Sequence, residues 1–260
     1  MRTIAVINQK GGVGKTTVTL NLSHALALRG YRVLAIDADP QGHLTMAFGL
    51  EDPVGLDRVL HGEARLEDAC SEAGNGLQIV AAGEHLQEVE NLNEGGAERG
   101  WRLKRALEDL RQPFDFVLID CPPSAGLLGM NAIIAASEML IPVAGDFLSL
   151  NGLSRLMRIL QGVEDRLGGE RPKWVVLSRF VEQRRHSREV RERIREHFGE
   201  GLLPTTIRES VVLAESPSFG QTIFEYQSRH RAAEDFLHLA DDLVAAGGQR
   251  MSADPQAAQA

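Results

Sequence analysis

The chain has 260 residues, of which 43% are hydrophobic and 25% charged, and its net charge is −8. This composition is typical of a globular protein with one sizeable core, and the acidic balance excludes a basic coat over the whole surface as a means of binding nucleic acid. Two cysteines, Cys70 and Cys121, exclude a disulfide scaffold and indicate a reducing compartment, so we expect a cytoplasmic protein.

Apolar strand patterns alternate with helical patterns along the chain. The expected strands are TIAVIN (3–8), YRVLAID (31–37), FDFVLID (114–120), EMLIPVA (138–144) and KWVVLS (173–178). The expected helices are KTTVTLNLSHALALRG, closed by Gly30, and residues 98–110, 150–167, 187–198 and 231–246. This alternation predicts an α/β fold in which a doubly wound, mostly parallel sheet carries helices on both faces. We expect one domain over residues 1–246 and a disordered tail over 247–260.

The segment KGGVGKTT (10–17) lies between the first strand and the first helix. Gly14, Lys15 and Thr16 match the end of the phosphate-binding pattern GxxxxGK[ST], but Gln9 stands where that pattern has its first glycine. Backbone N–H groups of such a loop cradle phosphates at the N-terminus of a helix. We therefore expect nucleotide phosphates to bind at Gly11, Gly12, Val13, Gly14, Lys15, Thr16 and Thr17.

Two of the four lysines in the chain, Lys10 and Lys15, lie in this loop, although the chain has 24 arginines. A phosphate-binding loop needs one lysine. A second subunit can deliver another lysine to a triphosphate only when the two subunits face each other across the nucleotides. The loop therefore favours a dimer that nucleotide holds together.

The absent glycine and the additional lysine together resemble the deviant Walker A motif of the ParA/MinD family of P-loop ATPases. The resemblance implies that Lys15 serves the phosphates of its own subunit and that Lys10 reaches the nucleotide of the partner. It also implies ATP and Mg²⁺ as cofactors.

Two further segments, AIDADPQGHLT and DCPPS, resemble the switch segment and the Walker B motif of this family. The resemblance implies that Asp39 orients the attacking water, that Asp37 supports the metal site, and that Asp120 holds Mg²⁺ through water beside the Thr16 hydroxyl. Each carboxylate stands at the carboxyl end of a strand, where open α/β sheets bind ligands. The segments NAIIAASEMLIPV and VVLAESPSFGQTIFEYQSRHRAAEDFLHLADDLV extend the likeness over residues 2–244.

The chain departs from the family at two positions that are associated with DNA binding, where Val212 and Gln183 stand in place of arginines. The segment EQRRHSREVRERIREHF instead holds six arginines. We expect DNA binding on a face formed by Arg184, Arg185, Arg188, Arg191 and Arg195, beside an apolar face of Val190, Ile194 and Phe198. The alternative is a solvated helix face on which Glu189, Glu192 and Glu196 pair with the arginines.

The remaining reactive side chains favour no second chemistry. Cys121 adjoins Asp120, yet metal–sulfur chemistry between subunits would need two suitably placed cysteines, so we expect core packing. His43 lies beside the switch segment, where a loop role is expected.

The resemblance implies an ATPase that forms an ATP-sandwich dimer, binds nucleoid DNA without sequence preference, and positions or segregates a cargo. A ParB-like or other cationic protein would stimulate its hydrolysis. One alternative is a metabolic P-loop enzyme, such as an ATP-dependent amidotransferase, which would need a second substrate pocket. Another is a MinD-like positioning ATPase, but QRMSADPQAAQA lacks the large apolar and clustered basic residues of a membrane-binding helix, so we expect no membrane partner.

Overall fold

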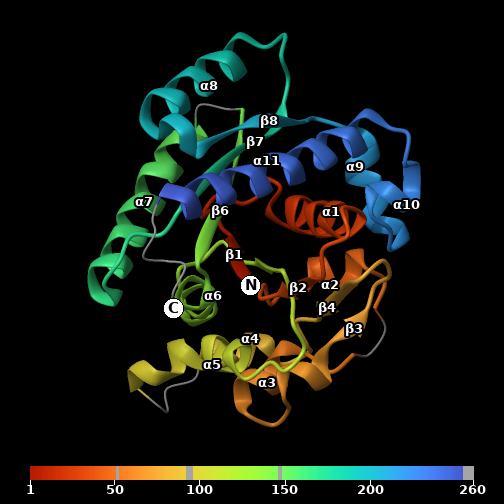
Figure 1. The fold of residues 1–260 in the computed structure, drawn as a ribbon, viewed down its shortest axis with the longest axis vertical. Coiled ribbons are helices and arrows are strands. Elements are labelled where there is room, and N and C mark those ends of the chain that lie inside the picture. Colours follow the sequence, from red (N-terminus) through yellow and green to blue (C-terminus); the bar gives the residue numbers. More distant parts are fainter. Residues whose placement is uncertain (51–52, 92–95, 146–147, 254–260) are drawn as a thin grey trace.

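The computed structural model describes residues 1–50, 53–91, 96–145 and 148–253, and only the backbone of 148–151 and 249–253. Its strands form an eight-stranded sheet in the order β3-β4-β2-β5-β1-β6-β7-β8 (Figure 1). All neighbouring strands run parallel except the antiparallel pair β3–β4. The strands are β1 (Arg2–Val6), β2 (Val33–Asp37), β3 (Ser71–Glu72), β4 (Leu77–Val80), β5 (Phe116–Asp120), β6 (Glu138–Ala144), β7 (Lys173–Phe180) and β8 (Leu202–Arg208).

Helices cover both faces of this sheet (Figure 1). One buried cluster is built on α1 (Lys15–Leu28), α2 (His43–Ala47), α9 (Val211–Glu215), α10 (Ile223–Gln227) and α11 (Arg231–Ala253). The opposite cluster is built on α3 (Leu56–His61), α4 (Leu86–Glu90), α5 (Arg102–Glu108), α6 (Leu127–Ala135), α7 (Leu148–Leu167) and α8 (Arg185–Phe198). Short 3₁₀ turns are η1 (Leu66–Ala69), η2 (Gly96–Trp101), η3 (Gly199–Gly201) and η4 (Ser216–Phe219). The expected doubly wound α/β class is confirmed.

The first strand explains why the central strands read as continuous apolar runs. Ile4 and Val6 pack into the α1–α11 cluster, whereas Ala5 and Ile7 pack into the cluster on the other face. Successive side chains of a strand point to opposite faces, so a strand that is covered twice must be apolar at every position.

The five expected strands are present, but the sequence patterns did not predict the two-residue strand β3, nor β4 and β8. β4 has only four residues, one of which is the polar Gln78. β8 lies at an edge of the sheet, contains Pro204, and alternates between buried and more exposed residues. Proline is tolerated on an edge strand because its missing N–H is not needed there.

The helix boundaries differ from expectation in two places. The expected helix 98–110 is the 3₁₀ turn η2 followed by α5, and the expected end of the last helix at residue 246 is wrong, because α11 continues to Ala253. Gly247 serves a close approach within that helix: a Cβ there would lie 2.4 Å from Cζ of Arg2, whose Nη1 donates to the carbonyl oxygen of Leu243 at 2.9 Å. The expected disordered tail covers residues 247–260, but 247–253 belong to α11, and 254–260 lie outside the described residues.

Candidate functional site

The predicted phosphate loop lies between the end of β1 and the first residue of α1. Gly12 and Gly14 have φ angles of 72° and 86°, a region that residues with a side chain rarely adopt. Gly14 directly precedes α1, so the unpaired N–H groups of the first helical turn lie at the loop. The backbone path therefore favours glycine at these two positions, which supports a loop that approaches an anion closely.

A cleft of about 790 Å³ opens at this loop, at the carboxyl ends of the strands. Its lining combines the predicted loop residues with the ends of β7 and β8 and the start of α9. The residues are Gly11, Gly12, Gly14, Lys15, Thr16, Thr17, Val18, Asp39, Gln41, His43, Pro123, Ser178, Arg179, Ile207, Arg208, Glu209, Ser210, Val211, Leu213 and Ala214. Of the three predicted carboxylates, only Asp39 belongs to the lining.

Asp120 lies behind the loop and is fully buried. Thr16 Oγ1 donates to its Oδ2 at 2.7 Å, and Thr19 Oγ1 lies 3.3 Å from its Oδ1. Burial raises the pKa of Asp120 well above its ordinary value, and the neighbouring carboxylate of Asp37 raises it further, whereas the Thr16 hydroxyl and the Lys15 ammonium oppose the rise. The loop thus borders a pocket of negative charge that a cation would stabilise.

Asp37 and Asp39 organise the segment after β2. The Asp37 carboxylate accepts from the backbone N–H of Asp39 at 3.2 Å and from both the N–H and the hydroxyl of Thr45 at 2.8 and 2.7 Å. These bonds oppose the rise in the pKa of Asp37 that its complete burial causes. Asp39 is 8% exposed and accepts from the backbone N–H of Gln41 at 3.0 Å. Asp37 therefore supports the segment from inside, and Asp39 faces the cleft.

The two lysines of the loop lie in different surroundings. Lys15 is buried at the start of α1 and lines the cleft, whereas Lys10 is half-buried and is not among the lining residues. The N–H of Lys10 donates to Oδ1 of Asn8 at 3.0 Å, and a Cβ built on Gly152 of α7 would lie 3.9 Å from the Lys10 Cβ. Lys10 is thus directed to the α7 side of the loop.

Sequence reasoning missed the wall of the cleft at the ends of β7 and β8. Ser178 Oγ donates to the Val13 carbonyl at 2.6 Å, and Arg179 Nη1 donates to the Gly12 carbonyl at 3.2 Å. Arg179 also pairs with Glu209 at 3.2 Å. Ser178 and Arg179 stand at the end of the expected strand KWVVLS, where open α/β sheets bind ligands, but only the strand order places that end beside the phosphate loop.

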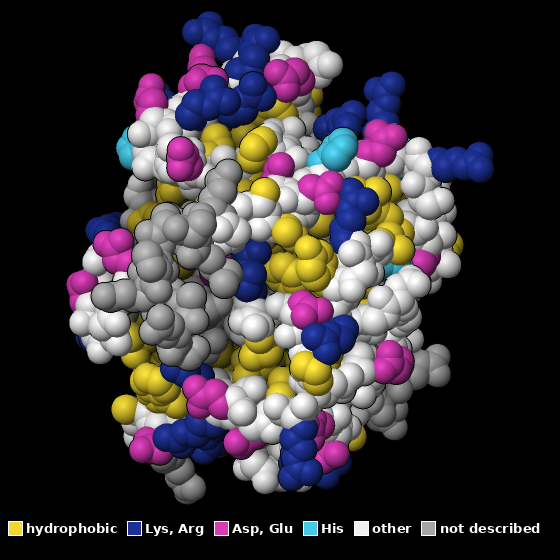
Figure 2. Space-filling model, viewed as in Figure 1, with side chains coloured by type: hydrophobic (Ala, Val, Ile, Leu, Met, Phe, Trp, Pro, Cys, Tyr) yellow, Lys and Arg dark blue, Asp and Glu magenta, His cyan; other side chains and the backbone are white. Residues whose placement is uncertain are grey.

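The predicted arginine face lies on and just before α8. Val190 and Ile194 are buried and Phe198 is half-buried, as expected for the neighbouring apolar face. Figure 2 shows Lys and Arg side chains with acidic side chains between them at the end of the molecule where Figure 1 draws α8. The ion pairs are Arg184–Glu209, Arg185–Glu189, Arg191–Glu182 and Arg195–Glu192, whereas Arg188 has no ion pair with the residues that the structure describes. Of the expected glutamate partners, Glu189 and Glu192 form ion pairs, whereas Glu196 forms none with the described residues.

The two positions that depart from the family border hollows of mixed charge. Val212 lines a hollow of about 340 Å³ with Arg208, Glu209, His230 and Arg231. Gln183 lines one of about 560 Å³, in which Arg208 and Arg231 lie with Glu182, Glu209 and Asp235. Arg231 is exposed and has no ion pair within the described ranges. It supplies positive charge beside both positions, which sequence reasoning did not find because Arg231 belongs to a different helix.

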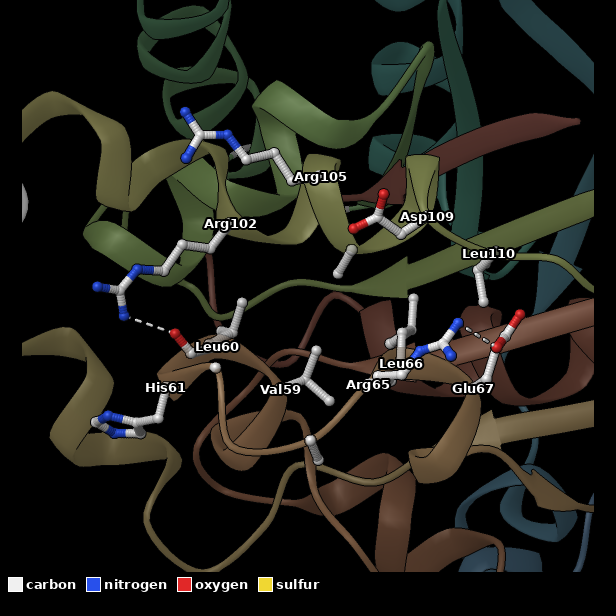
Figure 3. Close-up of a pocket in the computed structure, with 13 residues that line it drawn as sticks. Val59, Leu60, His61, Arg65, Leu66, Glu67, Arg102, Arg105, Asp109 and Leu110 are labelled. Carbon is white, nitrogen blue, oxygen red and sulfur yellow. Dashed lines mark hydrogen bonds and ion pairs between the residues drawn. The ribbon is translucent and has the colours of Figure 1, made fainter.

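Another hollow, of about 390 Å³, lies between α3 and α5 and contains none of the predicted site residues (Figure 3). Arg102 reaches across it, and its Nη1 donates to the Leu60 carbonyl at 2.6 Å. Arg65 pairs with Glu67 at 2.7 Å at the other end of the hollow. Its charges are therefore engaged with the protein itself.

Cys121 is buried and Cys70 is half-buried, and both thiols are free. Among the residues described, no group of three His, Cys, Asp or Glu side chains could hold a metal ion. Cys121 is fully buried in the core, as expected, and burial raises the pKa of both thiols. Within the same ranges, no helix is both long and apolar enough to cross a bilayer.

Comparisons with known proteins agree with this geometry. A family model described as an AAA domain matches residues 1–170. The chain is 38% identical over 251 residues to the chromosome partitioning protein ParA of Caulobacter vibrioides, with 94% of each chain covered. It is 36% identical over 249 residues to the sporulation initiation inhibitor protein Soj of Bacillus subtilis, covering 94% of this chain and 98% of that protein.

Solved structures share the fold over nearly the whole chain. A structure described as cobyrinic acid a,c-diamide synthase from Mycobacterium smegmatis, with bound ADP and magnesium, is 29% identical. It matches with a TM-score of 0.79 and covers 94% of each chain. The similarity therefore includes the ends of β7 and β8 as well as the phosphate loop.

Proposed function

The chain belongs to the ParA/MinD family of ATPases, and on that basis we propose that it is an ATP-driven switch that positions or segregates a cargo. Two copies close around two Mg·ATP, bind DNA without sequence preference, and release it when ATP is hydrolysed. The observation that carries the proposal is the 2.7 Å hydrogen bond from Thr16 Oγ1 to Asp120 Oδ2. It joins a glycine-rich loop to a buried carboxylate, the combination with which P-loop NTPases hold Mg²⁺.

The loop and its surroundings fit ATP and Mg²⁺. Gly11, Gly12, Val13, Gly14 and Thr17 would hold the phosphates through the loop backbone, with the Lys15 ammonium as counter-charge. Thr16 and Asp120 would hold Mg²⁺, with Asp37 behind them, because this ion is usually bound by one or two protein oxygens together with phosphates. When bound, the ion neutralises charge that develops on the phosphates. The Asp37 carboxylate raises the pKa of Asp120, and this supports the fit because a cation would relieve the repulsion.

Hydrolysis would depend on Asp39. Its carboxylate faces the cleft while its backbone N–H is held by Asp37, so the side chain has a defined place from which to orient water. We expect turnover to be slow until a ParB-like or other cationic protein adds positive charge at the dimer.

Dimer formation would depend on Lys10. The Cβ of Lys10 lies on the α7 side of the loop, and Lys10 does not line the cleft of its own subunit, so its side chain would serve a partner subunit that faces the loop. The negative charge of a triphosphate then favours the closed dimer, so bound ATP stabilises the contact between the subunits.

DNA binding would use the arginine face of α8 from Arg184 to Arg195, extended by Arg231. Exposed ion pairs contribute little to stability, so the paired arginines can exchange a glutamate for a phosphate at small cost. Such contacts carry no base information, which suits binding to the nucleoid without sequence preference. Dimerisation doubles the face and makes binding depend on nucleotide.

The alternative is a metabolic amidotransferase, because the similar Mycobacterium smegmatis structure is described as a diamide synthase. Glutamine-dependent amide transfer needs a reactive thiolate, which is a poor match to Cys121, buried in the core, or to Cys70, whose pKa burial raises to about 11. The hollow between α3 and α5 shares no lining residue with the cleft at the phosphate loop. A second substrate bound in that hollow would therefore not meet the nucleotide phosphates.

The proposal is tested by sedimentation of the full chain with Mg·ATP, together with DNA binding and ATP hydrolysis. We expect an ATP-dependent dimer that binds unrelated DNA sequences equally, and a Lys10→Ala variant that binds nucleotide as a monomer but no longer dimerises. Lys104→Ala on α5 is the matched control. Normal dimerisation of the Lys10 variant would contradict the role of Lys10. Binding to anionic vesicles in place of DNA would favour the MinD-like alternative.

A further inference from the structure

Arg179 has an unusual backbone conformation at the end of β7. Its φ angle is 48°, in the left-handed region that residues with a Cβ rarely adopt. The register between β7 and β8 shifts between Leu177 and Phe180, so the irregularity surrounds Arg179. Irregularities of this kind redirect a side chain and recur beside functional sites. Here the redirected side chain is a guanidinium that lines the cleft.

The Arg179 guanidinium connects two walls of that cleft. Nη1 donates to the Gly12 carbonyl of the phosphate loop at 3.2 Å, and Nη2 donates to Oε1 of Glu209 at 3.2 Å. The planar fork of arginine can span two acceptors, which the single ammonium of lysine does less well. Gly12 is itself in the left-handed region, so this contact holds a part of the loop whose conformation is already specific.

Glu209 divides its carboxylate between two arginines. Its Oε1 faces Arg179, and its Oε2 lies 3.3 Å from Nη1 of Arg184, the residue that directly precedes α8. A continuous chain of contacts therefore runs from the Gly12 carbonyl through Arg179 and Glu209 to the first arginine of the proposed DNA-binding face.

We propose that Arg179 is a positioning residue of the nucleotide site: it holds the phosphate loop at Gly12 and, through Glu209, ties the position of that loop to Arg184. The part that concerns DNA rests on the proposed function, whereas the part that concerns nucleotide does not. A movement of Gly12 on nucleotide binding would change the contact of Arg179 with Glu209. The contact of Glu209 with Arg184 would change with it, and so would the availability of Arg184 to a DNA phosphate.

A comparison of folding stability with nucleotide affinity distinguishes a positioning residue from a simple surface ion pair. The side chains of Arg179, Glu209 and Arg184 are 58%, 37% and 64% exposed, so their ion pairs contribute little to folding. Replacing Arg179 should therefore leave the thermal midpoint unchanged. Its effect should be visible in nucleotide affinity, because the loop that Arg179 holds is the one that contacts the phosphates.

The test is a double-mutant cycle on the full chain with Arg179→Ala, Glu209→Ala and both together. The probe is a fluorescent ATP analogue with Mg²⁺. Arg166→Ala on α7 is the matched control, because it removes an exposed arginine without an ion pair in the described part of the chain. We expect Arg179→Ala to weaken affinity about threefold to fivefold, the range of one exposed charge-assisted contact. The double variant should be no weaker than the weaker single variant. Unchanged affinity of Arg179→Ala, or additive losses, would overturn the proposal.

Measurements of DNA binding distinguish a failure of the link to Arg184 from a failure of the proposed function. Glu209→Ala should raise the affinity for a DNA duplex without nucleotide about threefold, because it releases Arg184 for one more phosphate contact. A wild-type protein that binds no DNA with ATP would reject the proposed function but not the nucleotide cycle. Wild-type DNA binding together with no change in the Glu209 variant would overturn the link to Arg184.

Discussion

The phosphate loop and the arginine face of α8 are both built from charged residues, yet they hold charge in opposite ways. Lys15 and Asp120 are 8% and 0% exposed, and each has a place set by backbone conformation and by specific hydrogen bonds. The arginines of α8 are mostly exposed and alternate with glutamates along one helix. A buried arrangement suits one phosphate group at one position, whereas an exposed and exchangeable one suits a long polyanion.

The pKa shifts of the two regions express the same contrast. Burial raises the pKa of Asp120, because removal from water penalises its charged form. The hydrogen bond from Arg185 lowers the pKa of Glu189, because that carboxylate keeps its water and gains a cation. Salt screens the exposed pair far more than the buried group. Ionic strength should therefore change DNA binding at α8 strongly and nucleotide binding at the loop only slightly.

The largest expected effect concerns turnover. Asp39→Ala should lower kcat by about 100-fold or more, the scale of a lost orienting or proton-accepting group, while ATP still binds. The measurements are stimulated ATP hydrolysis and nucleotide affinity, and Asp109→Ala at the exposed end of α5 is the control. Hydrolysis at the parental rate would show that the cleft orients water through another residue.

Nucleotide affinity should respond next. Lys15→Ala should weaken ATP binding by about 10-fold to 100-fold, because it removes a charge-assisted contact in a partly desolvated site. Titration of a fluorescent ATP analogue measures this, and Lys104→Ala replaces an exposed lysine as the control. If salt weakened binding in the parent as strongly as the substitution does, the contrast between a buried loop and a screened helix face would fail.

DNA affinity should respond more gently and with a strong dependence on salt. Replacing Arg184 and Arg185 with Glu should weaken binding equally on unrelated sequences and reduce the log–log salt slope by about 2, since each neutralised phosphate contributes about 0.9. Replacing Arg155 and Arg158 of α7 with Glu changes the net charge equally and is the control. An unchanged slope in the α8 variant would remove these arginines from the DNA face.

The smallest expected effect concerns folding. Arg195→Ala removes an ion pair whose side chains are 57% and 58% exposed, so the free energy of unfolding should change by less than about 0.5 kcal/mol. Thr19→Val deletes a buried hydroxyl that bonds to the Lys15 carbonyl at 3.0 Å, and it should cost about 1 kcal/mol or more. Urea unfolding measures both. Equal costs would mean that the α8 pair is structural and not exchangeable.

Much of the candidate site followed from local patterns. The strand-end carboxylates Asp37 and Asp120 were expected to lie together, and their strands are indeed neighbours with these residues in register. The contact of Thr16 with Asp120 follows from the same geometry. Ser178, Arg179 and Glu209 were missed because their strands had to be placed beside the loop first, and β8 carries Pro204 and only half of an apolar pattern.

Local sequence patterns account for the alternation of strands and helices, the glycine-rich loop and the mixed charge of α8. These are properties of neighbouring residues: apolar periodicity, the backbone freedom of glycine, and the spacing of side chains on a helix. Long-range packing alone brings Arg179 to Gly12, 167 residues earlier in the chain, and Arg231 to the hollows at Val212 and Gln183. Such meetings depend on strand order and on a register shift at the edge of the sheet, and no local period of the chain encodes either.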